Sequence, residues 1–309
     1  MNVLIKFGNF TGVITMGSLI TYLFYPIILV ASVSFAIFLN SKGFALTHII
    51  LLNALVFPGI ILLFEFIHPE TKDWRPRKSE VGVDILHAAL SNTLPPLLFK
   101  ALFFAAIIKL NSLITTNLGI DIWPHQLPIG LQVLLALVVA EIGFYWPHRI
   151  LHENTPIWPL HALHHSVEHM YLLAGGRTHP LQVFVTYGLQ MLILWLLGAP
   201  EKILMLHAVF TSTHGILQHA NVKMRFGFLN YIFATPELHR WHHSRVIKES
   251  NSNYGSNVCT WDLVFGSHHY FADKLPSEDI GLPPSIVIPD NYIEHMKSPF
   301  VFNKYDSDL

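Results

Sequence analysis

The sequence gathers imidazole side chains into three short clusters between its middle and residue 243. The clusters are His148 and His152; His161, His164 and His165; and His239, His242 and His243. Residues three or four apart share one face of a helix, so we expect each cluster to direct its imidazoles at one point. Neutral imidazole binds iron, copper, nickel and zinc, whereas calcium and magnesium prefer oxygen ligands. The spacing therefore predicts a transition-metal centre.

The size of this set favours two metal ions. One structural zinc ion needs four ligands, which usually include cysteine. The three clusters supply eight histidines, and Cys259 is the single cysteine of the chain. Ligation by histidine alone, with open coordination positions, suits a redox metal that activates O₂.

Long apolar segments surround the clusters. Of the 309 residues, 52% are hydrophobic and 13% are charged, whereas a soluble domain has roughly 25% charged residues. A membrane-spanning helix needs about 20 apolar residues. The segments that we predict to span are residues 14–39, 45–67, 83–110 and 127–145. We expect a kink in the third at Pro95 and Pro96, while residues 181–213 form either a spanning hairpin or one that dips in and returns.

Positive charges predict the orientation of these spans. The loop at residues 68–80 contains four basic residues, Lys72, Arg75, Arg77 and Lys78, whereas residues 111–126 contain none. We therefore expect the first loop, and everything after the fourth span, to be cytoplasmic. The predicted fold is all-α: an integral-membrane bundle of four or more transmembrane helices with a cytosolic helical cap that carries the histidine site.

The ordered clusters resemble the histidine boxes of the fatty acid hydroxylase and sterol desaturase superfamily, which are integral-membrane di-metal oxygenases. The flanking motifs that support the resemblance are Phe144-Tyr-Trp-Pro-His-Arg, Arg177-Thr-His-Pro, Asn253-Tyr-Gly and Trp261-Asp-Leu-Val-Phe-Gly. We divide the chain into an N-terminal transmembrane region (residues 1–126), a catalytic domain (residues 127–272) and a polar C-terminal tail (residues 273–309).

The resemblance implies additional metal ligands between the second and third clusters. The candidates are His214 and His219, whose separation of five residues corresponds to about 140° around a helix. An irregular turn would therefore be needed to direct both at one ion. Glu141 lies seven residues before His148 within an apolar span, where a carboxylate is costly and usually functional. We predict that Glu141 serves catalysis by orienting the imidazoles, with Asp262 as a second candidate.

The resemblance also implies the reaction and its partners. It implies O₂-dependent hydroxylation or desaturation of a sterol or fatty-acyl lipid by two iron ions, for which zinc can substitute in isolated protein. The sequence shows no nucleotide-binding or haem domain, so electrons must come from an external donor such as cytochrome b5, ferredoxin or a reductase. With 19 Lys and Arg against 20 Asp and Glu, we expect no nucleic-acid partner.

The alternative is a zinc-binding membrane protein, either a hydrolase or a metal transporter. A transporter would place its histidines along a path in the middle of its spans, and a hydrolase would need about three ligands and a catalytic carboxylate. A haem cytochrome with two axial histidines would leave most of these residues without a role. Metal analysis combined with an optical spectrum distinguishes all of these.

Overall fold

The computed structural model describes residues 3–7, 10–118, 122–277 and 279–305, and helices with connecting loops make up this part of the chain apart from one N-terminal hairpin and two isolated β-bridges. Strands β1 (Val3–Phe7) and β2 (Phe10–Ile14) of this hairpin pair antiparallel. The long helices are α1 (Met16–Ser41), α2 (Leu46–Ile67), α4 (Leu94–Leu118), α5 (Ile129–Glu153), α7 (Pro180–Leu196) and α8 (Glu201–His219). The shorter α-helices are α3 (Lys78–Leu86), α6 (Pro159–His165), α9 (Pro236–His242), α10 (Ile247–Ser250), α11 (Thr260–Phe265) and α12 (Tyr292–Lys297).

By length and composition, four helical segments of the described chain could cross a membrane, which confirms the predicted number. They are Met16–Ser41, Leu46–Ile67, Lys78–Asn117 and Ile129–Glu153. Large apolar side chains cover their outer faces; Leu55 and Phe66 of α2, for example, are 64% and 69% exposed. Exposed apolar surface of this extent suits contact with lipid.

The third candidate span is interrupted, as predicted, but earlier than expected. Helix α3 continues into a π-helical turn, η1 (His87–Ser91), and α4 begins at Leu94. Pro95 and Pro96 therefore occupy the first turn of α4 rather than the break itself. A proline is tolerated there, because the N–H groups of the first turn have no partner within the helix.

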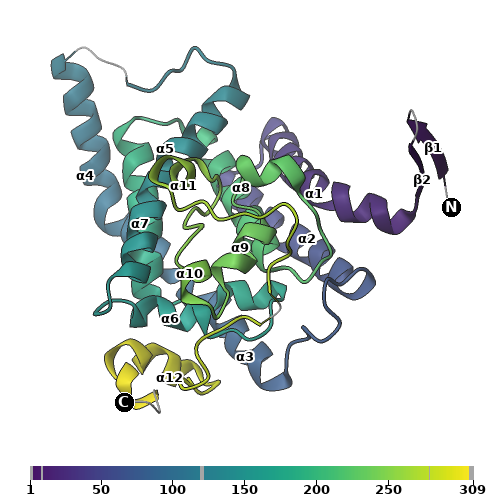
Figure 1. The fold of residues 1–309 in the computed structure, drawn as a ribbon. Helices are drawn as coiled ribbons and strands as arrows, with labels where there is room; N and C mark the ends of the chain where they lie inside the picture. Colours follow the sequence, from purple (N-terminus) through teal and green to yellow (C-terminus); the bar gives the residue numbers. More distant parts are fainter. Residues whose placement is uncertain (1–2, 8–9, 119–121, 278, 306–309) are drawn as a thin grey trace.

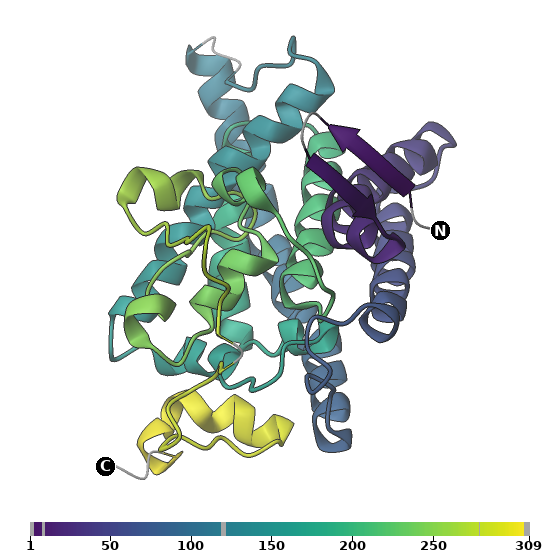
Figure 2. The same ribbon diagram turned by 45° about the vertical axis from the view of Figure 1, so that its right-hand side comes forward.

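The segment at residues 181–213 forms most of α7 and α8, which occupy the centre of the bundle (Figures 1 and 2). Helix α7 packs against α4 and α5, while α8 packs against α1, α2 and α5. Gly143 permits the close approach of α5 and α7, because a Cβ atom there would lie 2.8 Å from the carbonyl carbon of Leu189. This packing fixes the end of α5 that carries the first histidine cluster.

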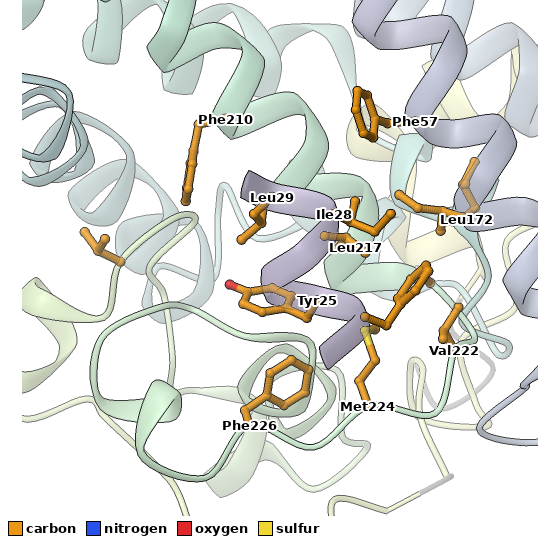
Figure 3. Packing of buried hydrophobic residues seen from close by; sticks show 14 of the residues in the cluster. Tyr25, Ile28, Leu29, Phe57, Leu172, Phe210, Leu217, Val222, Met224 and Phe226 are labelled. Atoms are coloured by element: carbon orange, nitrogen blue, oxygen red, sulfur yellow. The ribbon is translucent and has the colours of Figure 1, made fainter. Parts of the chain in front are cut away.

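The largest hydrophobic core joins α1, α2 and α8 to an extended segment at residues 222–226 (Figure 3). Val222, Met224 and Phe226 are buried in this core, and Phe226 meets Tyr25 of α1 edge-on with ring centroids 5.0 Å apart. Alternate residues of an extended segment point to opposite sides. Arg225 therefore faces away from the core.

The short helices α6 and α9 pack on the ends of α5 and α8. The C-terminal α12 lies at the same end of the molecule as α6 (Figure 1). Its His295 is buried, with Nδ1 2.9 Å from Nε2 of His87. The polar tail that we defined from the sequence thus includes a helix that is fixed to the membrane portion by buried contacts.

Candidate metal centre

Eight buried imidazoles converge on two groups. The first group is His148, His152, His161 and His242, and the second is His164, His219, His239 and His243. Within each group, the candidate ligand nitrogens all lie within 4.8 Å of one another. Helix α5 supplies the first group and α8 the second, while α6 and α9 each contribute to both.

The expectation that each cluster points to one site is wrong for the second and third clusters. His161 of α6 belongs to the first group, whereas His164 belongs to the second. The third cluster is divided in the same way, because His242 joins the first group and His239 the second. Successive residues are rotated by about 100° around a helix, so the residues three and four positions after the first lie on either side of it. Their side chains can therefore point to two adjacent sites.

His165 lies between the two groups. Its Nε2 is 3.1 Å from Nε2 of His161 and 3.2 Å from Nε2 of His242, both of the first group. Its ring also stacks on His243 of the second group, with centroids 4.4 Å apart. The directions of its nitrogen contacts make it a fifth candidate ligand of the first group.

His214 lies outside both groups, in contrast to the expectation for it. Its ring stacks on Phe210 at 5.6 Å and meets Tyr25 edge-on at 5.7 Å. Helix α8 stays regular through His219, so the irregular turn that the pair needed does not form. We therefore leave His214 out of the proposed ligand set and keep His219.

Hydrogen bonds at Nδ1 determine which nitrogen of each ring is free to bind a metal. The Nδ1 contacts are His148 with Tyr254 O (2.7 Å), His242 with Ser252 O (2.7 Å), His161 with Gln182 Oε1 (2.9 Å) and His164 with Arg177 O (3.2 Å). These oxygens can only accept, so Nδ1 carries the hydrogen in each neutral ring. The lone pair is then on Nε2, which faces into the group, as metal-binding histidines require.

The Nε2 atoms within each group are close enough together to bind one metal ion. The Nε2 atoms of His148 and His161 are 2.9 Å apart, and those of His219 and His239 are 3.1 Å apart. The Nδ1 atoms of His148 and His161 both face acceptors, so their two Nε2 atoms are unprotonated in the neutral rings and would repel each other without a cation. Two nitrogen ligands about 2.1 Å from one metal ion, and at right angles to each other, lie about 3.0 Å apart. The donor set thus fits a metal ion in each group.

Burial keeps the imidazoles of α6 and α9 neutral. Loss of hydration lowers the pKa of His164 to about 4. The pKa of His161 and that of His242 also lie well below the usual value, because burial disfavours the charged ring and neighbouring imidazoles repel it. At neutral pH these rings are in the form that binds metal.

Glu141 contacts the loop that follows α10 rather than an imidazole. Its carboxylate accepts hydrogen bonds from the backbone N–H groups of Ser256 and Asn257 and from the side-chain amide of Asn257. Glu141 is fully buried, and within the described chain its hydrogen-bond partners all belong to this loop. We infer that it is a positioning residue that acts on the histidines through the loop.

Asp262 holds the same loop from the other side. It accepts hydrogen bonds from the backbone N–H groups of Tyr254 and Gly255, both at 2.8 Å. The two carboxylates together bind four consecutive N–H groups, from Tyr254 to Asn257. The carbonyl of Tyr254 accepts the hydrogen bond of His148, so the clamp fixes one imidazole of the first group.

Gly175 is a site residue that the sequence did not single out. It lies in a 3₁₀ turn, η2 (Leu172–Gly176), beside the second group. A Cβ atom at this position would be 2.8 Å from Nδ1 of His219. The neighbouring pair of glycines before Arg177 was the one signal in the sequence, and nothing in its spacing indicates which ring it would meet.

Comparison with known proteins identifies a family match in the region of the chain that contains the two histidine groups. The family model for fatty acid hydroxylase matches residues 133–267, which include all the histidines of both groups. An ornithine lipid hydroxylase from Rhizobium tropici is 34% identical over 284 residues, which are 91% of this chain and 84% of that protein.

Two other relatives are similar over a smaller part of their length. An alkylglycerol monooxygenase from Xenopus tropicalis is 27% identical over 217 residues, covering 70% of this chain and 46% of that protein. A methylsterol monooxygenase from Arabidopsis thaliana is 24% identical over 147 residues, which are 47% of this chain and 54% of that protein. No solved structure matches the chain.

Proposed function

The chain belongs to the fatty acid hydroxylase family, and we propose that it is a membrane-bound oxygenase that uses O₂ to hydroxylate a lipid. The observation that carries this proposal is the pair of imidazole groups whose Nε2 atoms face one another. The names of the relatives agree with it, since they describe oxygenation of an ornithine lipid, an alkylglycerol and a methylsterol.

We propose that each group holds one iron ion and that zinc can replace iron in isolated protein. Bound iron would supply the activation of O₂. The first group would use His148, His152, His161, His165 and His242, and the second His164, His219, His239 and His243. The chain orients His148, His161, His164 and His242 through acceptors at Nδ1, and it keeps bulk water away from all nine rings by burying them.

The proposed orientation follows from the basic loop at residues 68–80, which places the metal centre on the cytoplasmic side. An external donor, such as cytochrome b5, ferredoxin or a reductase, would deliver electrons there. The division into a transmembrane region, a catalytic domain and a C-terminal tail also stays a proposal. The packing of α12 against His87 indicates that the tail is part of the folded unit.

Lipid mass spectrometry tests the proposed function. Membranes of cells that express the protein are expected to contain a lipid heavier by one oxygen atom, and ¹⁸O₂ should label that atom. Desaturation would instead remove two hydrogen atoms. A product that forms equally well without O₂ contradicts the proposal and favours a zinc hydrolase.

Replacing Glu141 with glutamine is expected to lower the hydroxylation rate about tenfold to a hundredfold. The amide can no longer accept hydrogen bonds at both ends, so part of the loop that orients His148 loses its partner. The rate, the metal content and the spectrum of the bound metal should be measured together. Glu168→Gln, at an exposed side chain, is the control. An unchanged rate and spectrum in Glu141→Gln would leave Glu141 with a packing role only.

A further inference from the structure

A polar cavity of about 90 Å³ lies on another face of α9 from the imidazoles. Its walls come from three segments that are distant in the sequence: the loop after α2, the extended segment at residues 222–226, and α9 itself. Residues 275–277 cover it from outside. The metal centre uses none of the side chains that line this cavity.

Two residues on the walls have buried polar atoms without a partner. Arg240 is 6% exposed, and its Nε and Nη2 have no hydrogen-bond partner among the described residues. The same holds for Oγ1 of Thr71, which is 8% exposed. Glu70 forms an ion pair with Nη1 of Arg240 at 3.6 Å, but its two short hydrogen bonds, at 2.8 and 2.9 Å, come from Arg225, so Nε and Nη2 of Arg240 stay without an acceptor. Buried donors normally have partners, so these indicate a ligand that brings acceptor atoms.

The charges around the cavity are balanced. Arg225 and Arg240 contribute two positive charges, and Glu70 and Glu237 contribute two negative charges. A simple anion would meet the two carboxylates, and a simple cation would meet the two guanidinium groups. Glu237 accepts one hydrogen bond, from Asn230 at 3.1 Å, and its carboxylate has further capacity to accept. The walls thus match a ligand that carries both a carboxylate and an ammonium group.

The walls are built without help from a ligand. Val222, Met224 and Phe226 are buried in the core (Figure 3). Arg225 lies between them in the sequence and lines the cavity instead. The side chain of Asn221 pins the backbone of Thr71, accepting from its N–H at 3.0 Å and donating to its carbonyl at 2.8 Å. The cavity is therefore a preformed site.

The cavity lies next to the ends of two spanning helices. Glu70 follows the end of α2 by three residues, and the backbone N–H of Arg225 donates to the carbonyl of Thr21 in α1 at 2.9 Å. Nearby apolar side chains are exposed: Tyr22 by 61% and Phe66 by 69%. This surface suits acyl chains, which favour the bilayer.

We propose that the cavity binds the headgroup of an aminolipid, with the carboxylate at Arg240 and Thr71 and the ammonium group at Glu237. The inference rests on the proposed lipid hydroxylase function and names the class of its substrate. Because α9 also carries His239 and His242, the site that selects the headgroup and the metal centre share one helix.

Binding to the purified full-length protein in detergent tests this proposal. The probes are ornithine, succinate, putrescine and inorganic phosphate, followed by ornithine lipid and phosphatidylglycerol in nanodiscs. Ornithine is expected to bind at least about tenfold more tightly than succinate, putrescine or phosphate, and ornithine lipid more tightly than phosphatidylglycerol. Ligand binding should also raise the unfolding temperature.

Variants distinguish a ligand site from a structural cavity. Arg240→Gln is expected to weaken ornithine binding at least about tenfold, whereas Arg245→Gln, which changes a guanidinium outside the cavity, should leave it unchanged. Thr71→Val covers the case in which Arg240→Gln does not fold. It removes an unpaired buried hydroxyl, so the ligand-free protein should be as stable as the wild type or more stable, while the affinity for ornithine falls severalfold.

Each other outcome overturns a defined part of the proposal. Equal binding of succinate or phosphate means an anion site, and absence of binding by every probe means a water-filled cavity. Binding of free ornithine without ornithine lipid means a metabolite site. Lipid hydroxylation without aminolipid binding rejects this inference alone, whereas aminolipid binding without O₂-dependent oxidation rejects the proposed function alone.

Discussion

His242→Ala and His164→Ala are each expected to reduce lipid hydroxylation by more than about a hundredfold, which exceeds the effect of changing a group that only orients a ligand. Both rings are buried, and Nδ1 of each is bound to a backbone carbonyl, which leaves Nε2 for the metal. Alanine removes one coordinating nitrogen, so the remaining imidazoles of its group hold the metal ion with one ligand fewer.

The two variants should lose different metal ions, because His242 belongs to the first group and His164 to the second. Metal analysis of each purified variant is expected to show about half of the wild-type content, and the spectra of the remaining ions should differ. His48→Ala, at an exposed position of α2, is the control and should keep both ions. Full activity in either ligand variant would contradict the proposed centre.

The helical spacing of the histidines correctly predicted that their side chains gather in one place, but not how they divide between two groups. Apolar length alone located the four helical segments that could span a membrane, because a helix in lipid must satisfy its backbone internally and needs a minimum length. The assignment of His161 and His164 to different groups depends on the packing of α6, which brings His161 against His148 of α5 and His164 against His243 after α9. That packing arises from contacts between distant segments, which a local pattern does not contain.

The dependence on contacts between distant segments also explains why the sequence did not predict the surroundings of His214 and Glu141. A histidine in a membrane helix can face a metal or an aromatic core, and the rotation of α8 against α1 decides which; for His214 the result is contact with Phe210 and Tyr25. The position of Glu141 in an apolar span correctly indicated a buried carboxylate with specific partners. Those partners, Ser256 and Asn257, are more than a hundred residues away.

Gly175→Ala is expected to remove the metal of the second group while leaving that of the first. The new methyl carbon would lie 2.8 Å from Nδ1 and 2.9 Å from Cγ of His219, far closer than carbon and nitrogen atoms approach without a bond. The 3₁₀ turn that holds Gly175 has little freedom to retreat. The carboxylate of Glu65 accepts from the N–H of Leu172 in this turn at 2.7 Å and from the N–H of Asn221 at 2.8 Å, which ties the turn to the segment after His219.

The imidazole of His219 must therefore move, and its Nε2 then leaves the position 3.1 Å from Nε2 of His239. Displacement of one ligand should lower hydroxylation by about tenfold to a hundredfold and release about half of the bound metal. Gly176→Ala is the matched control. It places the same methyl group in the same turn, but the nearest atom, the backbone nitrogen of Ala88, is 3.5 Å away, which is an ordinary contact.

Both alanine variants reduce the conformational freedom of the unfolded chain to the same extent, so a difference between them reports the contact with His219 alone. We expect the Gly176→Ala protein to keep both ions and its rate to stay within about twofold of the wild type, because surface-like changes without a clash have small effects. If the two variants lose metal equally, the turn rather than the His219 ring is the sensitive element. If neither variant loses metal, the His219 imidazole can move away from the new methyl group without loss of the ion, and His219 is not a required ligand of the second group.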